Sequence, residues 1–240
     1  MIARKFPQLT VAVCEDRVKG VNRLMQSVQP PEVVALDDVY QHRHIMPKLN
    51  ILLTEYGDPF CDDHILPFGN LRESRRGRRR ADIVVVTKCP DQLTESEQQQ
   101  IRRRLKISDK QQLFFSHIEY GEPVSLFGEA TMDGCEDVVL VTGIAHPEPL
   151  VKYLERKYKV HHLRFSDHHS FDEADYRKIE DAYNSLGGSR KAVVTTEKDA
   201  ARMMNGERLC SLPVFYIPIE VKIQNQSAFD SAVLSAAGQG

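Results

Sequence analysis

The sequence lacks an excess of charge of either sign. Its 240 residues carry 32 Lys and Arg against 34 Asp and Glu, which gives a formal net charge of −2 at pH 7. A protein that binds nucleic acid through its overall charge needs a positive field that displaces phosphate counterions, and a chain with this balance has none. The composition therefore predicts that nucleic acid is not a partner.

Long apolar runs are also missing. No stretch approaches the ~18 consecutive apolar residues that cross a bilayer. The first residues, MIARKFPQLTVAV, mix charge and proline with short apolar stretches. They contain no apolar signal-peptide core, so we expect no secretory signal.

Cysteine is sparse and scattered. The five cysteines form no C-x-x-C pair and stand at positions 14, 61, 89, 135 and 210. This odd number and wide spacing argue against a disulfide framework and against a thiolate zinc site. Both exclusions fit a reducing cytoplasm.

Short runs rich in β-branched residues predict the strands. They are continuous rather than alternating, a pattern typical of strands buried on both faces of a parallel sheet. They cover residues 10–15, 33–38, 50–56, 81–88, 137–145, 191–199 and 213–219. Helical patterns lie between them at residues 18–27, 94–105, 146–157 and 171–186. The alternation predicts a doubly wound, mostly parallel α/β sheet.

Glycine, proline and acidic residues cluster at positions 121–136, between two better-patterned halves of the chain. Such a cluster is typical of a connection between domains. We expect one α/β domain over residues 1–125 and a smaller α/β lobe over residues 126–240.

The first candidate site follows the run at 33–38, because ligands of such sheets bind outside the carboxyl ends of the strands. Asp37 and Asp38 end this run. Carboxylates fixed there suit the Mg²⁺ of a nucleotide site, although the same pair also serves simply to stop a strand and begin a turn. Gln41 and His42 add polar groups to that turn.

The second candidate site is the segment LPFGNLRESRRGRRR at residues 66–80. Pro67 and Gly69 allow a close approach of the backbone. Arg72, which follows them, offers a guanidinium suited to phosphate, and Glu73 could share a metal ion with Asp37 or Asp38. Five arginines follow, beginning with Arg75 and Arg76. They form either a solvated helix face or a local positive patch for a phosphorylated or membrane-borne substrate.

The third candidate site is Asp167-His168-His169, after a short strand. An aspartate beside a histidine suits proton transfer or metal binding. The structural alternative is that Ser166 or Asp167 caps a helix that begins near residue 171.

The fourth candidate site is the end of the run at 191–199. Thr196 ends a strand, and Glu197 and Lys198 open a helix, where an anion commonly meets hydroxyl and amide groups. Acidic residues in a first helical turn also complement the helix dipole without any ligand. Thr87 and Lys88, after the run at 81–88, are further candidates for approaching a nucleotide.

Six segments in order, LDDVYQHR, ILPFGNLRE, RADIVVVTKCP, VTGIAHP, FSDHH and VVTTEKDAAR, resemble the tetraacyldisaccharide 4'-kinase family of Gram-negative bacteria, in a Bacteroidetes-like form. The resemblance covers nearly all of residues 1–220. It implies transfer of the γ-phosphate of ATP, with Mg²⁺, to the 4'-hydroxyl of tetraacyldisaccharide 1-phosphate, a lipid A precursor. It also implies a P-loop-kinase-like fold with a smaller C-terminal lobe, at the cytoplasmic face of the inner membrane.

The resemblance sharpens the roles of the candidate residues. Asp37 and Asp38 match the family's metal-binding acids, Arg72 and Glu73 match its L-R-E motif, and His168 matches a histidine that partners the catalytic base. The complete expectation is: catalytic His168, Asp167 and Arg72; metal-binding Asp37, Asp38 and Glu73; nucleotide-binding Thr87, Lys88, Thr196, Glu197 and Lys198; substrate-binding Gln41, His42, Arg75 and Arg76.

A phosphate loop of the form G-x-x-x-x-G-K-[ST] is absent from the sequence. In the family, that loop and an acidic G-D-E motif precede the position that corresponds to Met1. We therefore expect a P-loop domain that is incomplete at its N-terminal side. Because a positioned electrostatic group is typically worth ~10² to 10³ in rate, we also expect this chain alone to have little kinase activity.

Two other functions stay open. The triplet at 167–169 spells the motif of the DHH phosphoesterases, which hydrolyse phosphate esters with Mn²⁺, but the D-x-D and G-G-G-H motifs of that family are absent. The second alternative is a non-catalytic module that binds anionic lipid or phosphate through the arginines at 75–80.

Overall fold

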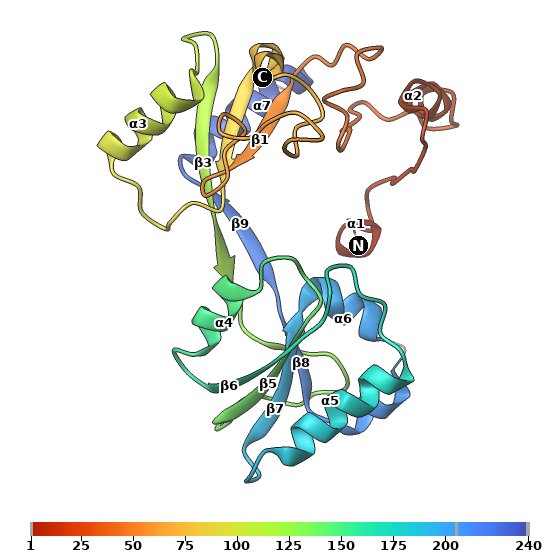
Figure 1. Ribbon diagram of the computed structural model, residues 1–240. Helices are drawn as coiled ribbons and strands as arrows, with labels where there is room; N and C mark the ends of the chain where they lie inside the picture. Colours follow the sequence, from red (N-terminus) through yellow and green to blue (C-terminus); the bar gives the residue numbers. More distant parts are fainter. Residues whose placement is uncertain (1, 205, 239–240) are drawn as a thin grey trace. The chain divides into compact units, whose positions relative to one another are not determined.

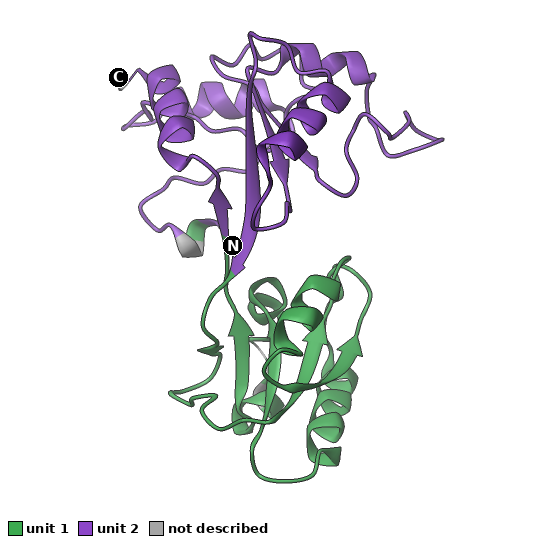
Figure 2. Cartoon of the chain, turned by 90° about the vertical axis from the view of Figure 1, so that its left-hand side faces the viewer, with its two compact units in different colours: residues 1, 3–5, 120–220 green, residues 2, 6–119, 221–240 purple. Residues whose placement is uncertain are grey.

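The structure, a computed structural model, describes residues 2–204 and 206–238 and divides into two compact units (Figures 1 and 2). Unit 2 holds Phe6–Glu119 and the segment from Val221 onward, and unit 1 holds Tyr120–Glu220. From Phe6 onward, the chain therefore leaves unit 2 once and returns to it. The expected division into two domains at residues 125/126 stays a prediction. In the structure, the segment from Val221 onward belongs to the same compact unit as Phe6–Glu119.

The sheet that begins in unit 2 has the strand order β1-β2-β3-β9. Its strands are β1 (Ile51–Glu55), β2 (Ile83–Thr87), β3 (Gln112–Tyr120) and β9 (Ile219–Ile223), and the first three are parallel. The helices of unit 2 are α2 (Arg17–Met25), the 3-10 helix η1 (Arg75–Arg80), α3 (Glu95–Leu105) and α7 (Gln226–Ala237), whereas most of α1 (Ile2–Lys5) is grouped with unit 1.

Both faces of β2 are buried. Val84 and Val86 pack with Leu105 of α3, whereas the alternate residues Ile83 and Val85 pack with apolar residues of α7. Because side chains alternate between the faces of a strand, a run that is apolar throughout needs cover on both sides. The helices α3 and α7 provide that cover.

The sheet of unit 1 has the strand order β4-β8-β7-β5-β6. Its strands are β4 (Val124–Ser125), β5 (Asp137–Thr142), β6 (Lys159–Arg164), β7 (Lys191–Thr196) and β8 (Val214–Ile217). All neighbours are parallel except β4, which is antiparallel to β8. The helices are α4 (Glu148–Leu154), α5 (Glu173–Ser185), α6 (Glu197–Met203) and the 3-10 helix η2 (Glu207–Ser211).

The core of unit 1 also has two layers. Val138 and Leu140 of β5 pack with α4, and the alternate residues Val139 and Val141 pack with α5 and α6. From β5 the chain goes to β6 on one side, then to β7 on the other side of β5. This reversal creates a topological switch point at the carboxyl ends of β5 and β7, the place where doubly wound sheets bind ligands.

The predicted α/β class, doubly wound and mostly parallel, is confirmed. The runs at 50–56, 81–88, 137–145, 191–199 and 213–219 contain β1, β2, β5, β7 and β8, and the four predicted helices are α2, α3, α4 and α5. The capping box that opens α3 is present, with the amide of Thr94 donating to Glu97 Oε2 at 2.8 Å.

The predicted strands at 10–15 and 33–38 are wrong. In the described part of the chain neither run pairs with another strand, and Val13 and Val33 remain exposed. A parallel strand is stable only when neighbours complete its hydrogen bonds and bury its side chains. These apolar runs lack both and stay extended coil.

None of the helices in the described residues combines the length and the hydropathy that crossing a bilayer requires.

The thiol of Cys89 is expected to react slowly with alkylating reagents. This thiol is buried just after the end of β2, and burial raises its pKa to about 11, because the thiolate loses its hydration. Cys210 is exposed. At pH 8 we expect iodoacetamide to modify Cys210 at least roughly tenfold faster, as measured by peptide mass spectrometry; equal rates would show that Cys89 is accessible.

Candidate active site

The D-D and L-R-E motifs lie together in unit 2. Arg72 Nη1 is 2.8 Å from Asp38 Oδ2, and Glu73 accepts hydrogen bonds from Arg80 Nη2 at 2.6 Å and Arg43 Nη2 at 3.5 Å. Asp38 has the left-handed φ of 48° that its turn requires. Two motifs separated by more than thirty residues thus form one polar cluster.

The carboxylates of this cluster supply oxygen ligands of the kind that Mg²⁺ prefers. However, Asp38 and Glu73 are both paired with arginines. No group of three His, Cys, Asp or Glu side chains converges on a point among the described residues. The assignment of Asp37, Asp38 and Glu73 as Mg²⁺ ligands therefore stays a prediction.

The arginine run forms η1 at the amino end of β2, two residues before that strand begins. Arg78 Nε donates to Leu105 O at 3.1 Å, Arg75 Nε donates to Asp63 O at 2.7 Å, and Arg80 lies 4.6 Å over the ring of Tyr40. These contacts connect η1 with the end of α3 and with the loops that carry Asp63 and Tyr40. Part of the run is therefore structural.

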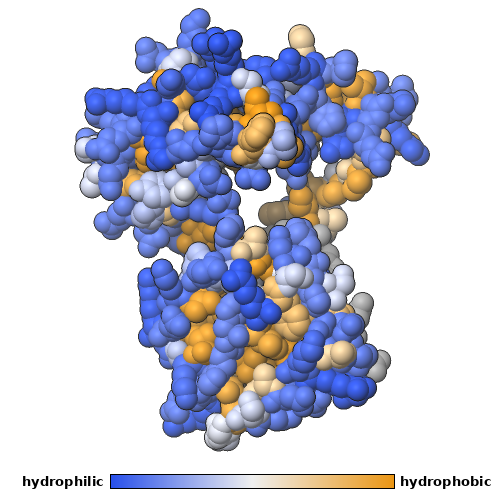
Figure 3. Space-filling view, viewed as in Figure 1, coloured by the Kyte–Doolittle hydropathy of each residue, from blue (hydrophilic) through white to orange (hydrophobic). Residues whose placement is uncertain are grey.

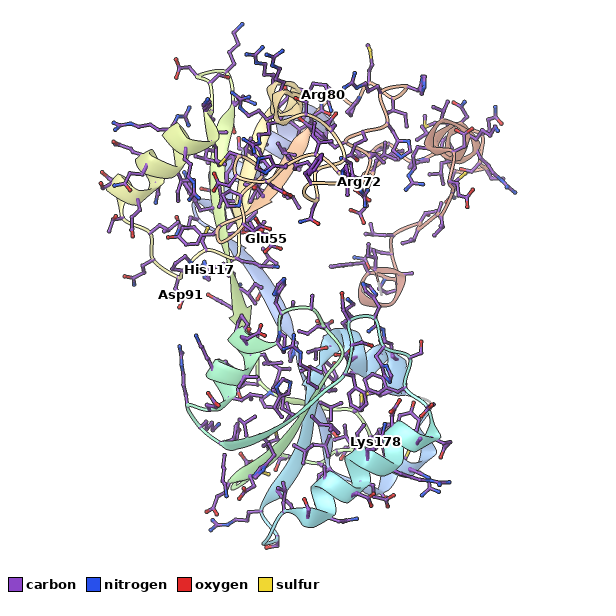
Figure 4. All side chains as sticks on the ribbon, in the orientation of Figure 1. Glu55, Arg72, Arg80, Asp91, His117 and Lys178 are labelled. Carbon is purple, nitrogen blue, oxygen red and sulfur yellow. The ribbon has the colours of Figure 1, made fainter. Side chains whose placement is uncertain are left out.

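The rest of the run is a positive surface. The side chains of Arg76 and Arg79 are exposed and have no ion pair within the described residues. Figure 4 shows Arg80 at the opposite end of unit 2 from Glu55 and His117, which lie near the carboxyl ends of β1 and β3. Arg75 and Arg76 therefore lie at the amino end of the sheet, and their role in binding the substrate stays a prediction.

The carboxyl ends of β1 and β2 meet through Lys88, which forms an ion pair with Glu55. Thr87 Oγ1 donates to Thr54 O at 3.3 Å. Lys88 has a φ of 55°, which turns the chain sharply after β2. Thr87 and Lys88 therefore stand where a parallel sheet binds ligands, as expected, and Glu55 joins them although the sequence analysis did not select it.

His117 is a second residue that the sequence analysis missed. Its Nδ1 is buried without a hydrogen-bond partner among the described residues, and its Nε2 is 3.4 Å from Glu119 Oε1. Only its position near the end of an apolar run, LFFSH, could have drawn attention to it. The predicted substrate residues Gln41 and His42 are exposed, in a turn closed by the bond from His42 N to Val39 O at 2.8 Å.

In unit 1 the third and fourth candidate sites lie together at the switch point. Lys198 Nζ is 3.5 Å from Asp167 Oδ1 and 3.5 Å from His168 Nε2. Although desolvation acts in the opposite direction, the charge of Lys198 and the amide of His168 lower the pKa of Asp167. The structure therefore brings Asp167, His168 and Lys198 into one charged cluster at the carboxyl ends of the strands.

Thr196 ends β7 and is the N-cap of α6. Its Oγ1 accepts from the amide of Asp199 at 3.0 Å and donates to Asp199 Oδ2 at 2.8 Å, and Glu197 opens the helix. This capping occupies the hydroxyl expected to meet the nucleotide. The expectation that Ser166 or Asp167 caps the helix near residue 171 is wrong: Asp172 accepts from the amides of the first turn of α5.

His169 does not face the same way as His168. Its Nε2 is 2.6 Å from Asp175 Oδ2, and its ring stacks 4.8 Å from Phe165. Burial by itself would raise the pKa of Asp175, but hydrogen bonds from His169 and Lys178 outweigh it and lower that pKa to about 2. His169 is thus a core-facing partner of Asp175, and the D-H-H triplet does not act as a single ligand set.

Asp175→Asn is expected to lower the free energy of unfolding by roughly 2 kcal/mol at pH 7, since the pKa falls from 3.8 to about 2 on folding. The contribution of a depressed carboxyl pKa is complete above its unfolded value and disappears as the pH falls through the folded one. Urea unfolding at pH 7 and at pH 3 measures this: the difference between wild type and variant should shrink at the lower pH. The exposed Asp181→Asn is the control and should show no such difference at either pH.

Comparison with solved structures supports the fold. LpxK from Aquifex aeolicus, solved with ATP, superposes with a TM-score of 0.62 and 24% sequence identity, over 93% of this chain and 63% of that chain. The likeness concerns the fold. It shows that this chain shares the α/β fold of that protein, in agreement with its mostly parallel sheets.

Sequence comparison identifies the family. The family model for tetraacyldisaccharide-1-P 4'-kinase matches residues 1–237. A tetraacyldisaccharide 4'-kinase of Bacteroides fragilis is 41% identical over 94% of this chain and 64% of its own length. One of Flavobacterium johnsoniae is 41% identical over 96% of this chain and 67% of its own length. The chain belongs to the tetraacyldisaccharide-1-phosphate 4'-kinase family, and it spans less than two thirds of the first of these relatives.

Proposed function

We propose that this chain takes part in transferring the γ-phosphate of ATP, with Mg²⁺, to the 4'-hydroxyl of tetraacyldisaccharide 1-phosphate in lipid A biosynthesis. The observation that carries the proposal is the family match over residues 1–237. The cluster of Asp167, His168 and Lys198 at the switch point supports it, because anionic ligands of doubly wound sheets bind there.

The proposed roles follow from chemistry and position. His168 and Asp167 would handle the proton of the attacking hydroxyl, because an exposed imidazole beside a carboxylate suits general acid–base work. Lys88, Lys198 and Arg72 would attract phosphate oxygens at the ends of the strands. Asp37, Asp38 and Glu73 would hold Mg²⁺, which neutralises charge on the phosphates when it is bound.

The test is ATP-dependent phosphorylation of the disaccharide by the purified chain, followed by mass spectrometry over long incubations. We expect a product with one added phosphate at the 4'-position, formed at least ~10² times more slowly than by a full-length relative, since the sequence has no phosphate loop. His168→Ala should abolish the product, whereas the exposed His146→Ala, outside the cluster, should not. A chain that binds neither MgATP nor the disaccharide would contradict the proposal.

We also propose that the chain works at an anionic membrane surface, at the cytoplasmic face of the inner membrane, through Arg76 and Arg79 of η1. Their side chains are exposed and without ion pairs among the described residues. Figure 3 shows strongly hydrophilic atoms over the end of unit 2 at which Figure 4 places Arg80. This surface favours electrostatic binding over insertion.

Removing these two charges should weaken membrane binding. A basic residue near an anionic surface contributes about 1 kcal/mol, so Arg76→Gln with Arg79→Gln should lower the affinity for phosphatidylglycerol vesicles roughly thirtyfold in sedimentation assays. The control is Arg156→Gln with Arg177→Gln, which removes the same charge from unit 1. Equal losses in the two double variants would mean that only net charge matters.

Neither alternative function gains support from the geometry. A DHH phosphoesterase needs the triplet to bind Mn²⁺, yet His169 is hydrogen-bonded to Asp175. A purely lipid-binding module leaves the switch-point cluster without a role.

A further inference from the structure

Asp199 is a completely buried carboxylate in the first turn of α6. Its Oδ2 accepts hydrogen bonds from the amide of Gly143 at 2.9 Å and from Thr196 Oγ1 at 2.8 Å. Its Oδ1 pairs with Arg202 Nη1 at 3.0 Å. A buried charge is costly unless it is fully paired, so this carboxylate has a specific reason to be here.

Asp199 joins two strand ends. Gly143 follows β5, and Asp199 belongs to the helix that follows β7, so the bond to the Gly143 amide closes the switch point between them. The carbonyl of the same glycine accepts from the amide of His168 at 3.1 Å. The Gly143 peptide therefore connects the buried carboxylate to the loop that carries His168.

Arg202 makes a second connection to His168. One terminal nitrogen is bound to Asp199, and the other, Nη2, is 3.1 Å from His168 Nδ1. A guanidinium only donates hydrogen bonds, so Nδ1 must be the accepting, unprotonated nitrogen of the neutral ring. The ring proton is then on Nε2, which is 3.7 Å from Asp167 Oδ2.

A second donor lies on the other side of the ring. Lys198 Nζ is 3.5 Å from Nε2 and is paired with Asp167 Oδ1, whereas Arg202 Nη2 is 3.1 Å from Nδ1, so the closer donor decides which nitrogen accepts. The His168 side chain is 70% exposed, so neighbouring side chains do not fix its ring by packing. Its orientation depends on the hydrogen bond from Arg202 and on a backbone held at φ 59°.

We propose that Asp199 and Arg202 are positioning residues that fix His168 as the Nε2–H tautomer, with its proton-bearing nitrogen turned to Asp167 and the open side of the switch point. The proposal rests on the proposed function for its catalytic meaning: a ring protonated at Nε2 donates there, so the proton of the attacking hydroxyl would pass to Asp167, which His168 Nε2–H faces. The tautomer itself is a property of this chain and does not depend on turnover.

The experiment is a long-range ¹H–¹⁵N correlation spectrum of the chain labelled at its histidine ring nitrogens, recorded at pH 8. The His168 signals are assigned with His168→Gln. We expect His168 to show a single Nε2–H pattern with a hydrogen-bonded Nδ1, whereas the exposed His146 shows the averaged pattern of a free ring. In Arg202→Met, His168 should lose its single pattern and resemble His146.

Two further variants separate positioning from folding. Arg202→Lys keeps a donor and should restore part of the single pattern. Arg208→Met breaks the ion pairs of Arg208 with Glu173 and Glu180 on the same unit, and should leave His168 unchanged. An unchanged His168 spectrum in folded Arg202→Met would overturn the proposal. If that variant does not fold, an averaged pattern for His168 in the unsubstituted chain overturns it instead.

The same spectra distinguish this proposal from the proposed function. A fixed tautomer that Arg202→Met releases, in a chain that never phosphorylates the disaccharide, supports the positioning and contradicts the kinase role. Phosphorylation that occurs with a freely averaging His168 ring supports the kinase role and contradicts the positioning. Where turnover is measurable, Arg202→Met should lower kcat and leave the KM for ATP within twofold.

Discussion

Replacing Asp199 with alanine is expected to lower the stability of unit 1 by about 3–5 kcal/mol, the usual cost of breaking a buried ion pair by removing one partner. The substitution leaves the guanidinium of Arg202 and the amide of Gly143 without their acceptor inside the unit. It also removes the partner of the Thr196 hydroxyl. Each of these three polar groups would then lose a hydrogen bond, and each loss costs free energy.

Amide hydrogen exchange of the peptides from β5 and β7 measures this effect where it arises, because the two strands end at the affected site. The matched control is Asp181→Ala, which removes an exposed carboxylate from α5 of the same unit. We expect faster exchange in both strands for Asp199→Ala and no change for the control. A loss of less than 1 kcal/mol would show that water replaces the carboxylate, and that the network is weaker than its geometry indicates.

Replacing Gly69 with alanine is expected to open the loop that carries the L-R-E motif. A Cβ at this position would lie 2.2 Å from Asp63 Oδ1, 2.4 Å from His64 O and 2.6 Å from His64 N. Two of these atoms belong to the backbone, which cannot move aside without breaking the bond from Leu71 N to His64 O. Overpacking of this kind typically costs about 1–3 kcal/mol.

The loop contacts define the readouts. Asp63 accepts from the amide of Asn70 at 3.1 Å, and its carbonyl accepts from Arg75 Nε at 2.7 Å, so the substitution should loosen Arg72 and Arg75 together. We expect a lower unfolding temperature and faster proteolysis at residues 63–71. Gly57→Ala is the control, since a Cβ there meets nothing within 4 Å. Similar behaviour of the two variants would show that Asp63 and His64 leave room for a Cβ at position 69.

The predicted strands show how far the apolar pattern can be trusted. The runs at 81–88 and 137–145 became β2 and β5 because helices cover both of their faces. The equally apolar run at 10–15 did not, since it has no neighbouring strand in the described residues. The apolar pattern indicates which side chains of a segment can be buried. It does not indicate whether a neighbouring strand or helix is present to bury them.

The polar strand β6 was expected only as a short strand before Asp167, without bounds, because its composition gives a weak signal. It contains two adjacent histidines and no fully buried residue, and its place at the edge of the sheet leaves one side open. Its histidines are satisfied locally, as His162 Nε2 lies 2.8 Å from Thr142 Oγ1 and His161 Nε2 lies 3.1 Å from Asp137 Oδ1. Such cross-strand pairs stabilise a strand that composition alone does not indicate.

The sequence by itself determined the α/β class, the family, and the identity of most polar groups in the two clusters, because motifs such as D-D, L-R-E and T-E-K-D are contiguous. Only the tertiary structure decided how those groups are used. It placed the arginine run at the amino end of its sheet, committed Thr196 to a helix cap, and connected Asp199 through Arg202 to His168. The physical reason is that hydrogen bonds between side chains depend on strand order, and strand order brings together residues that lie far apart in the chain.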